Sequence, residues 1–358
     1  MSRTVVIAGG GTGGHIFPGL AVAEQLQAVG VAVHWLGARR GLEAELVGQR
    51  GLPLTLVEIE GIHAREPAAA VRALLALPSA IAGALRALLR VQPMAILGVG
   101  GYASAAGVLG GGMLGLPWVL QEQNAIPGWT NRLLAPWADL ICCGFADAVA
   151  EFPSLDAEWT GNPVRSQFFD IAGPALHEPP HLLILGGSQG SLFINRVLPR
   201  ALAELAATGV RPKVLHQAGV RWAEVVRTAY ADLHLEAEVR AFLAEPWTSL
   251  ARADLIVARS GALTVAELAA AGRAALLIPF AAAAGNHQEH NARSLERAGG
   301  AVVLHEHDAT PARVAAVLGE LMAEPNRIGA MAENTRSFAL PDAARRIAEK
   351  VIAVGGGA

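Results

Sequence analysis

Residues 5–14 read Val-Val-Ile-Ala-Gly-Gly-Gly-Thr-Gly-Gly, and residues 182–190 read Leu-Leu-Ile-Leu-Gly-Gly-Ser-Gln-Gly. Both stretches begin with an apolar run of strand length, pass directly into a glycine-rich turn and continue into an apolar helical stretch. A strand, a glycine turn and a helix form the opening unit of a Rossmann-like domain. The repeat of this unit predicts two such domains.

Short aliphatic runs alternate with helical segments along the rest of the chain, which is the pattern of parallel sheets covered by helices on both faces. The predicted strands are 4–8, 31–36, 95–98, 118–120 and 140–142 in the first half, and 181–185, 214–217, 238–242, 255–258, 275–278 and 301–303 in the second. We therefore predict an α/β fold of two Rossmann-like domains whose parallel sheets face each other across a ligand-binding cleft. Prolines cluster at Asn162-Pro163 and in 174–180, which indicates a boundary between domains there. The predicted divisions are a first domain at 1–163, a second at 164–340, and a C-terminal helix and tail at 341–358. Packing of this tail back on the first domain is one option.

The composition excludes several classes of function. The 358 residues carry 28 basic and 31 acidic side chains and a net charge of −3, so no global field attracts nucleic acid, and no nucleic-acid partner is expected. The two cysteines, Cys142 and Cys143, are adjacent and form neither a disulfide framework nor a spaced metal site. They fit a buried strand in a reducing cytosol. No export signal is visible at the amino terminus.

The first glycine turn has the G-x-G-x-x-G spacing of a dinucleotide site at Gly9, Gly11 and Gly14. An NAD site also needs an acidic residue at the end of the second strand, but residues 36–40 read Leu-Gly-Ala-Arg-Arg. NAD is therefore disfavoured. Arg39 and Arg40 leave an NADP-dependent oxidoreductase as an open alternative.

Similar turns follow two other predicted strands, at Gly98, Gly100 and Gly101 and at Gly186, Gly187 and Gly190, and neither has the Lys-Ser/Thr of a P-loop. Backbone amides exposed by glycines beside helix N-termini hold phosphate without a metal, so the three turns favour at least two phosphorylated ligands. The alternative is that the glycines only permit tight strand-to-helix turns.

A further helix entry follows the predicted strand 255–258, where the chain reads Arg259-Ser260-Gly261-Ala262-Leu263-Thr264-Val265-Ala266-Glu267. Free amides near Ser260–Leu263 would face a diphosphate, and Gly272 is the expected C-cap of this helix. Glu267 either binds a ribose diol or forms a capping box with Thr264, and the spacing alone favours the cap.

Six motifs of the chain, in order, resemble those of one family. They are Gly10-Gly11-Thr12-Gly13-Gly14-His15-x-x-Pro18-Gly19, Gly100-Gly101-Tyr102, Glu122-Gln123-Asn124-x-x-Pro127-Gly128-x-x-Asn131, Gly161-Asn162-Pro163-Val164-Arg165, Gly186-Gly187-Ser188-Gln189-Gly190 and Arg259-Ser260-Gly261-Ala262-Leu263-Thr264. Over about residues 5–345 the chain thus resembles the MurG family, the N-acetylglucosaminyltransferases of peptidoglycan synthesis. It departs from the family pattern at Gln121, at 103–106 and at Asn286 without losing a motif.

The resemblance implies a GT-B fold in which the first domain binds the acceptor and associates with the membrane, and the second binds UDP-N-acetylglucosamine. The implied acceptor is the undecaprenyl-linked lipid I, and the implied product is lipid II. The implied location is peripheral, at the cytoplasmic face of the plasma membrane, with cell-wall synthesis proteins as candidate partners. By motif, the implied donor contacts are Thr12, Gly13, Gly14, Asn124, Arg165, Ser188, Leu243, Ala262, Leu263, Thr264, Val265, Ala266, Glu267 and Gln288, and the implied acceptor-diphosphate contacts are Gly13, Gly14, Gly100, Gly101 and Tyr102.

The implied reaction is an inverting displacement that needs a general base. His15 is the first candidate, because its side chain titrates near neutral pH, and the alternative is a structural hydrogen bond at the helix entry. Glu122 is the second, at the carboxyl end of a buried strand, and the alternative is a role in shaping the loop. Amides and the dipole of the Ser260–Leu263 entry would stabilise the departing UDP, so neither a cofactor nor a metal is expected. The sequence around His305-x-His307-Asp308 reads as a solvated loop.

Residues 71–90 combine an apolar composition with Arg72, Arg86 and Arg90, which suits the surface of an anionic bilayer. Pro78 and the arginines argue against a membrane span, and an ordinary helix packed on the sheet is the alternative.

Two further alternatives for the function stay open, since the donor half does not reveal the acceptor. One is a related GT-B enzyme with another lipid or small-molecule acceptor, and the other is a non-catalytic UDP-sugar-binding subunit.

Overall fold

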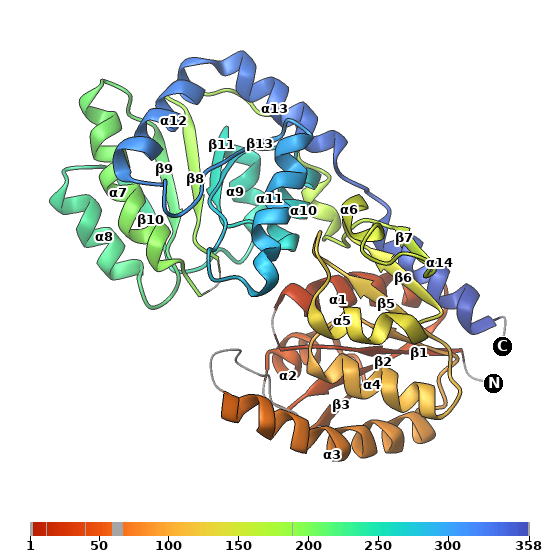
Figure 1. Ribbon diagram of the computed structural model, residues 1–358. Helices are drawn as coiled ribbons and strands as arrows, with labels where there is room; N and C mark the ends of the chain where they lie inside the picture. The colour runs from red at the N-terminus through yellow and green to blue at the C-terminus, as the bar shows by residue number, and fades with distance from the viewer. Residues whose placement is uncertain (1–2, 12, 40, 59–66, 188, 357–358) are drawn as a thin grey trace. The chain divides into compact units, whose positions relative to one another are not determined.

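The computed structural model describes residues 3–11, 13–39, 41–58, 67–187 and 189–356. The chain divides into two compact units (Figure 1), unit 1 with residues 1–165 and 342–358 and unit 2 with residues 166–341. Each unit is a parallel sheet covered by helices, which confirms the predicted α/β class with two Rossmann-like domains.

Unit 1 contains a seven-stranded parallel sheet in the order β3-β2-β1-β4-β5-β6-β7. The chain leaves β1 toward β2 and leaves β4 toward β5, so the topological switch point lies between β1 and β4, where ligands of such sheets bind. The strands are β1 (Thr4–Ala8), β2 (Ala32–Ala38), β3 (Leu54–Val57), β4 (Ala95–Gly98), β5 (Trp118–Glu122), β6 (Leu140–Cys143) and β7 (Ala157–Trp159). The helices are α1 (Gly13–Ala28), α2 (Glu43–Leu46), η1 (Gly48–Arg50), α3 (Pro67–Val91), α4 (Tyr102–Met113), α5 (Trp129–Leu134), η2 (Ala135–Trp137), α6 (Ala146–Val149) and α14 (Ala343–Gly356).

Alternate residues of the unit 1 strands face two separate cores, as the two-residue period of a strand requires. Val6 and Ala8 of β1 point into a core covered by α3 and α4, whereas Val5 and Ile7 point into a core covered by α1 and α14. The C-terminal helix α14 therefore belongs to unit 1, where Lys350 also pairs with Glu158 of β7 at 2.5 Å.

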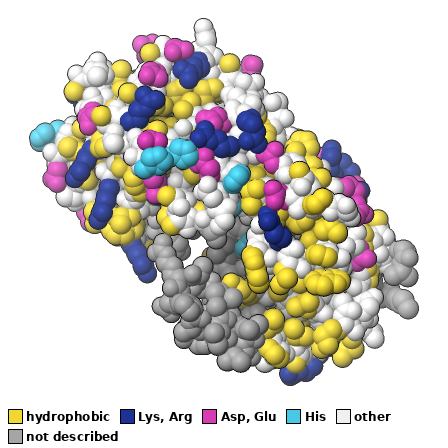
Figure 2. Space-filling model, in the orientation of Figure 1, with side chains coloured by type: hydrophobic (Ala, Val, Ile, Leu, Met, Phe, Trp, Pro, Cys, Tyr) yellow, Lys and Arg dark blue, Asp and Glu magenta, His cyan; other side chains and the backbone are white. Residues whose placement is uncertain are grey.

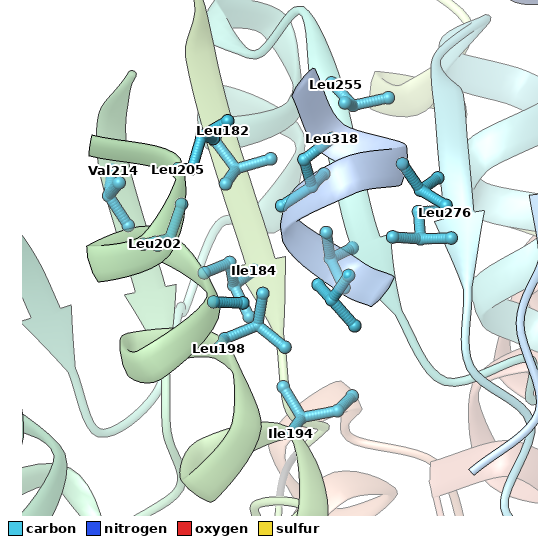
Figure 3. Packing of buried hydrophobic residues seen from close by; sticks show 14 of the residues in the cluster. Leu182, Ile184, Ile194, Leu198, Leu202, Leu205, Val214, Leu255, Leu276 and Leu318 are labelled. Carbon is cyan, nitrogen blue, oxygen red and sulfur yellow. The ribbon is translucent and has the colours of Figure 1, made fainter. Parts of the chain in front are cut away.

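Unit 2 contains a six-stranded parallel sheet in the order β10-β9-β8-β11-β12-β13, with its switch point between β8 and β11. Apolar residues of its strands pack against α7 and α12 (Figure 3), for example Ile184 of β8 against Leu198 of α7. The strands are β8 (His181–Leu185), β9 (Lys213–Gln217), β10 (Ala237–Arg240), β11 (Leu255–Ala258), β12 (Ala274–Leu277) and β13 (Ala301–Val303). The helices are η3 (Ser166–Phe168), α7 (Leu192–Ala207), α8 (Ala223–Asp232), α9 (Pro246–Arg252), α10 (Ala262–Ala271), η4 (Ala284–Asn286), α11 (His287–Arg297), α12 (Pro311–Ala323) and α13 (Pro325–Ser337).

The predicted strand at 238–242 is misplaced. β10 begins one residue earlier and ends at Arg240, because Arg240 pairs with Gln217 and β9 ends there, which leaves residues 241 and 242 without a partner strand. Residues 91–121 carry no charged side chain, and they form β4, α4 and most of β5 inside unit 1. Over the part of the chain that the structure describes, no helix is long and apolar enough to cross a membrane.

Candidate active site

The first glycine turn joins β1 to α1 at the switch point of unit 1. The helix α1 begins at Gly13, within the glycine turn itself. Pro18 is the sixth residue of α1, so its missing amide hydrogen removes the hydrogen bond that would otherwise run to the carbonyl of Gly14. His15 therefore lies in the first turn of α1, half-buried, with Gly13 and Gly14 directly before it. Thr12 lies outside the described residues.

A buried glutamate holds this turn through hydrogen bonds to its backbone. Glu43, at the start of α2, is fully buried, and its Oε1 accepts hydrogen bonds from the backbone amides of Gly11 (2.9 Å) and Ala38 (3.0 Å). A Cβ atom on Gly10 would lie 1.7 Å from the same oxygen, so only glycine leaves room for this side chain. The sequence patterns did not single out Glu43. The available signal was an acidic residue five positions after the end of β2, the strand next to the one that leads into the first glycine turn. The Gly11 amide, which a dinucleotide pyrophosphate would need, is already occupied.

The second glycine turn, between β4 and α4, packs directly on the first. Gly10 donates its amide hydrogen to the carbonyl of Gly100 (3.3 Å), and a Cβ atom on Gly101 would lie 2.5 Å from the carbonyl oxygen of Gly10. A Cβ atom on Gly100 would lie 2.6 Å from Nδ1 of His15, so the imidazole lies against the backbone of this turn. Gly100 and Gly101 adopt φ values of 96° and 82°, which favour glycine.

The N-terminus of α4 carries Gly101 as its N-cap and has no side-chain cap. The first amides of an α-helix make no hydrogen bond inside that helix and point out of its N-terminal end. The structure thus brings together His15, Gly13 and Gly14 with Gly100, Gly101 and Tyr102. Two helix N-termini in one place favour an anionic group there.

The loop after β5 is organised around Glu122. This carboxylate is buried, with Oε1 accepting from the amide (2.9 Å) and the Nδ2 (3.1 Å) of Asn124, and Oε2 accepting from the amide of Gly128 (3.0 Å) and from Nδ2 of Asn131 (2.9 Å). Both oxygens are therefore engaged in holding the loop. This geometry favours the loop-shaping alternative over the role of general base.

Arg165, at the end of unit 1, places its guanidinium carbon 5.2 Å from the centre of the Phe17 ring. Phe17 follows His15 on α1, so the cation–π contact holds a positive charge beside the first turns of that helix. A sequence contains no pattern that predicts this pairing across nearly 150 positions.

In unit 2 the helix entry at the switch point begins at Ala262, with Gly261 as the N-cap and no side-chain cap. The capping-box interpretation of Thr264 and Glu267 is therefore wrong, because Thr264 is already the third residue of the helix and does not precede it. The amides of the first turn of α10 stay available to a ligand. The C-cap prediction is confirmed, since Gly272 ends the helix with a φ of 58°.

The entry to α10 is braced by α11. Ser260 donates its hydroxyl to the carbonyl of Gln288 (2.7 Å), and Nδ2 of Asn291 donates to the carbonyl of Ser260 (3.1 Å). The side chain of Gln288 accepts from the amide of Phe280 (3.0 Å), which ties in the loop after β12. Leu243 is buried in the loop between β10 and α9, and Ser188 lies outside the described residues.

A cavity of about 1330 Å³ in unit 2 lies elsewhere. Its lining includes His181, Lys213 and Arg252, from the amino-terminal ends of β8 and β9 and the end of α9, and it contains none of the predicted donor contacts. It is therefore at the opposite edge of the sheet from the site that the switch point defines.

No group of three or more His, Cys, Asp or Glu side chains in the described ranges is placed to hold a metal ion. His305 instead places Nδ1 3.1 Å from Glu289 and Nε2 2.9 Å from Arg293. His307 pairs with Asp308 on the surface.

Comparisons with known proteins cover the whole chain. Residues 5–142 match the glycosyltransferase family 28 N-terminal domain, and residues 181–347 match the glycosyltransferase family 28 C-terminal domain. Proteins named UDP-N-acetylglucosamine–N-acetylmuramyl-(pentapeptide) pyrophosphoryl-undecaprenol N-acetylglucosamine transferase are similar over 100% of both chains, with 42% identity for Stutzerimonas stutzeri and 44% for Nitrosococcus oceani. A crystal structure of Acinetobacter baumannii MurG covers 98% of this chain, and this chain covers 99% of it, with 33% identity and a TM-score of 0.82.

The fold and the two switch-point sites therefore define a two-domain α/β glycosyltransferase of the GT-B type. Within that class, the chain belongs to glycosyltransferase family 28. The NADP-dependent oxidoreductase is thereby wrong. Its physical weakness is visible in unit 1, where Glu43 occupies the Gly11 amide and Arg39 is paired with Glu58 at 2.5 Å, whereas Arg40 lies outside the described residues.

Proposed function

We propose that this glycosyltransferase moves N-acetylglucosamine from UDP-N-acetylglucosamine to the C4 hydroxyl of the muramoyl unit of lipid I, which gives lipid II. The similar full-length proteins carry the name of this reaction. The structural observation that carries the proposal is the pair of uncapped helix N-termini, α4 and α10, one at each switch point. Two such sites suit two ligands that both contain a diphosphate, a nucleotide sugar and a pyrophosphoryl lipid.

Unit 2 takes the donor in this proposal. The diphosphate of the UDP-sugar lies at the free amides of Ala262, Leu263 and Thr264, and Glu267 binds the ribose from half-buried surroundings one turn further along α10. Charge develops on the departing UDP as the glycosidic bond breaks, and fixed amides and the helix dipole stabilise it there. The remaining proposed donor contacts are Thr12, Gly13, Gly14, Asn124, Arg165, Ser188, Leu243, Val265, Ala266 and Gln288.

Unit 1 takes the acceptor, with its diphosphate at Gly13, Gly14, Gly100, Gly101 and Tyr102. His15 is the proposed general base, because it stands in the first turn of α1 with its ring against Gly100, between the two glycine turns. Glu122 supports the loop of Asn124 and is assigned no proton transfer. The reaction inverts the anomeric carbon in one displacement.

The test is transfer of label from UDP-N-acetylglucosamine to a lipid I analogue by the purified protein, with and without EDTA. We expect transfer that EDTA does not abolish. Binding of the UDP-sugar without transfer to lipid I would favour a different acceptor or a non-catalytic binding subunit, and a screen of acceptors separates these two.

We also place unit 1 at the cytoplasmic face of the plasma membrane, where an undecaprenyl-linked acceptor resides and where cell-wall synthesis proteins are candidate partners. Trp129, Leu133 and Trp137 recur every four residues through α5 and η2, and they are 78%, 52% and 65% exposed. A stripe of this kind is too apolar to be an ordinary solvated face. Figure 2 shows hydrophobic side chains gathered over α4 and α5.

Vesicle sedimentation tests this placement. We expect Trp129→Ser with Trp137→Ser to weaken binding to vesicles of anionic phospholipid at least tenfold. The matched control is Trp159→Ser, an exposed tryptophan on the outer strand β7. Equal loss in both variants, or none in either, would contradict the assignment of the stripe.

A further inference from the structure

One arginine connects the loops at the carboxyl edge of the unit 2 sheet. Arg259 lies between β11 and the N-cap of α10, and its side chain is only 14% exposed. Its Nε donates to Oγ of Ser191 (3.0 Å), and its Nη1 donates to the carbonyls of Ile278 (3.1 Å) and Pro279 (3.2 Å). Its Nη2 forms an ion pair with Glu306.

These partners come from three different connections, and Arg259 adds a fourth. Ser191 is the N-cap of α7 and closes the glycine turn after β8, Ile278 and Pro279 begin the loop after β12, and Glu306 belongs to the connection after β13. Arg259 itself belongs to the connection after β11. A planar guanidinium with five donors in a fixed fork can hold such an arrangement, whereas a lysine ammonium cannot.

The guanidinium is also packed between aromatic rings. Its central carbon lies 5.6 Å from the ring centre of Phe193 and 5.4 Å from that of Phe280. Phe280 is the residue whose amide donates to Gln288, a proposed donor contact. The contacts of Arg259 therefore reach connections that lead to three sets of proposed donor residues. These are Ser188 before α7, Ala262–Glu267 in the first turns of α10, and Gln288 in the first turn of α11.

We propose that Arg259, with Glu306 as its counter-charge, is a positioning residue that holds the diphosphate-binding loops of unit 2 in register. This inference rests on the proposed function, because it takes the UDP-sugar as the donor. The inference predicts that loss of Arg259 affects one part of the nucleotide more than another. Leu243, which the family resemblance places beside the uracil, lies in the loop between β10 and α9, and this loop is not among the four connections that Arg259 joins. Arg259 thus acts mainly on the affinity for the diphosphate. Its effect on nucleoside affinity is small, because Glu267, the proposed ribose contact, lies a full turn beyond the entry of α10 that Arg259 joins.

The experiment compares UDP binding by calorimetry with uridine binding by ligand-observed NMR, in the full-length protein. We expect Arg259→Lys and Arg259→Met to weaken UDP binding at least tenfold, with uridine binding changed less than twofold. Arg259→Lys separates positioning from simple charge, because it keeps the positive charge and loses the fork. Glu306→Gln keeps an acceptor oxygen and should stay within threefold of the wild type, whereas Glu306→Ala should lose about three- to tenfold for UDP alone.

The matched control is Arg273→Lys. Arg273 is equally an arginine bonded to backbone carbonyls, those of Leu250, Ala251 and Ala172 among them, but it precedes β12 at the opposite edge of the sheet. We expect it to lower the melting temperature without changing the ratio of UDP to uridine affinity. Should both Arg259 variants fail to fold, Glu306→Ala decides, since it leaves the arginine in place.

The inference is overturned if Arg259→Lys binds UDP as tightly as the wild type, or if UDP and uridine affinities fall by the same factor. It is overturned too if Arg273→Lys shifts the ratio as much as Arg259→Lys, because general loosening of unit 2 would then explain the loss. A wild-type protein that binds no UDP refutes the donor assignment of the proposed function, and the role of Arg259 falls with it.

Discussion

Acid should destabilise unit 2 through one buried histidine, His216 of β9. It is fully buried, with Nδ1 3.0 Å from the hydroxyl of Tyr230 and Nε2 3.1 Å from Oδ1 of Asn195. Asn195 is oriented by its own Nδ2, which donates to the carbonyl of Ala218 (2.9 Å), so its Oδ1 must face the histidine. Nε2 therefore carries the hydrogen, and Nδ1 accepts from Tyr230.

Burial lowers the pKa of His216 from 6.5 to about 3 in the folded protein. The unfolded chain takes up a proton as the pH falls below 6.5, and the folded protein does not, so the free energy of unfolding falls with decreasing pH between 6.5 and 3. At pH 5.0 the loss from this group is about 2 kcal/mol relative to pH 7.5, and the full shift corresponds to about 5 kcal/mol.

Urea unfolding followed by circular dichroism, at pH 7.5 and at pH 5.0, measures this loss. Between these pH values we expect the wild type to lose about 2 kcal/mol more than His216→Gln, which cannot titrate there. His234→Asn is the control, because His234 is exposed and its φ of 53° suits asparagine. It should keep the wild-type loss. Equal losses in the wild type and His216→Gln would refute the reasoning, since other titrating groups would then account for the acid sensitivity.

Three further outcomes follow from the unit 1 site. His15→Ala should lower kcat by about 10²- to 10⁴-fold with UDP affinity unchanged in calorimetry, and a smaller loss would remove the histidine from proton transfer. Glu122→Gln should lower the melting temperature and raise the KM values, because the single amide oxygen of glutamine cannot accept from all four donors of this loop. The pH profile of kcat should keep its shape. A large fall in kcat at unchanged stability would instead restore Glu122 as the base. Gly101→Ala should cost about 2 kcal/mol of stability and most of the activity, as its φ of 82° and the carbonyl of Gly10 exclude a Cβ; a normal melting temperature would show that the turn adapts.

Sequence patterns predicted the fold well where they were local. β1, β4, β8, β11 and β13 have the predicted ends. For β1, β8 and β11 the reason is local, because each is flanked on both sides by glycine, proline or a charged residue. β3 and β7 were missed, since these outer strands have four and three residues, and neither shows a long apolar run. The ends of strands such as β10 depend on the length of the neighbouring strand, which no single stretch contains.

The loops that form the site could be predicted from the sequence, but the contacts between their residues could not. The glycine turns and the α10 entry are local patterns, and the structure places both at switch points. The roles of Glu43 and Arg259 depend on partners that lie 32 and 68 positions away, Gly11 and Ser191, and a single sequence does not pair them.

The bond between Glu43 and the Gly11 amide makes this carboxylate an intramolecular ligand of its own glycine turn. A tethered group competes at its effective concentration, whereas a free nucleotide competes only at the concentration it reaches in solution. The turn therefore disfavours dinucleotides because the Glu43 carboxylate already holds the amide that a pyrophosphate would bind, and no steric barrier is needed. A chain can keep the glycine spacing of a cofactor site and still be closed to the cofactor.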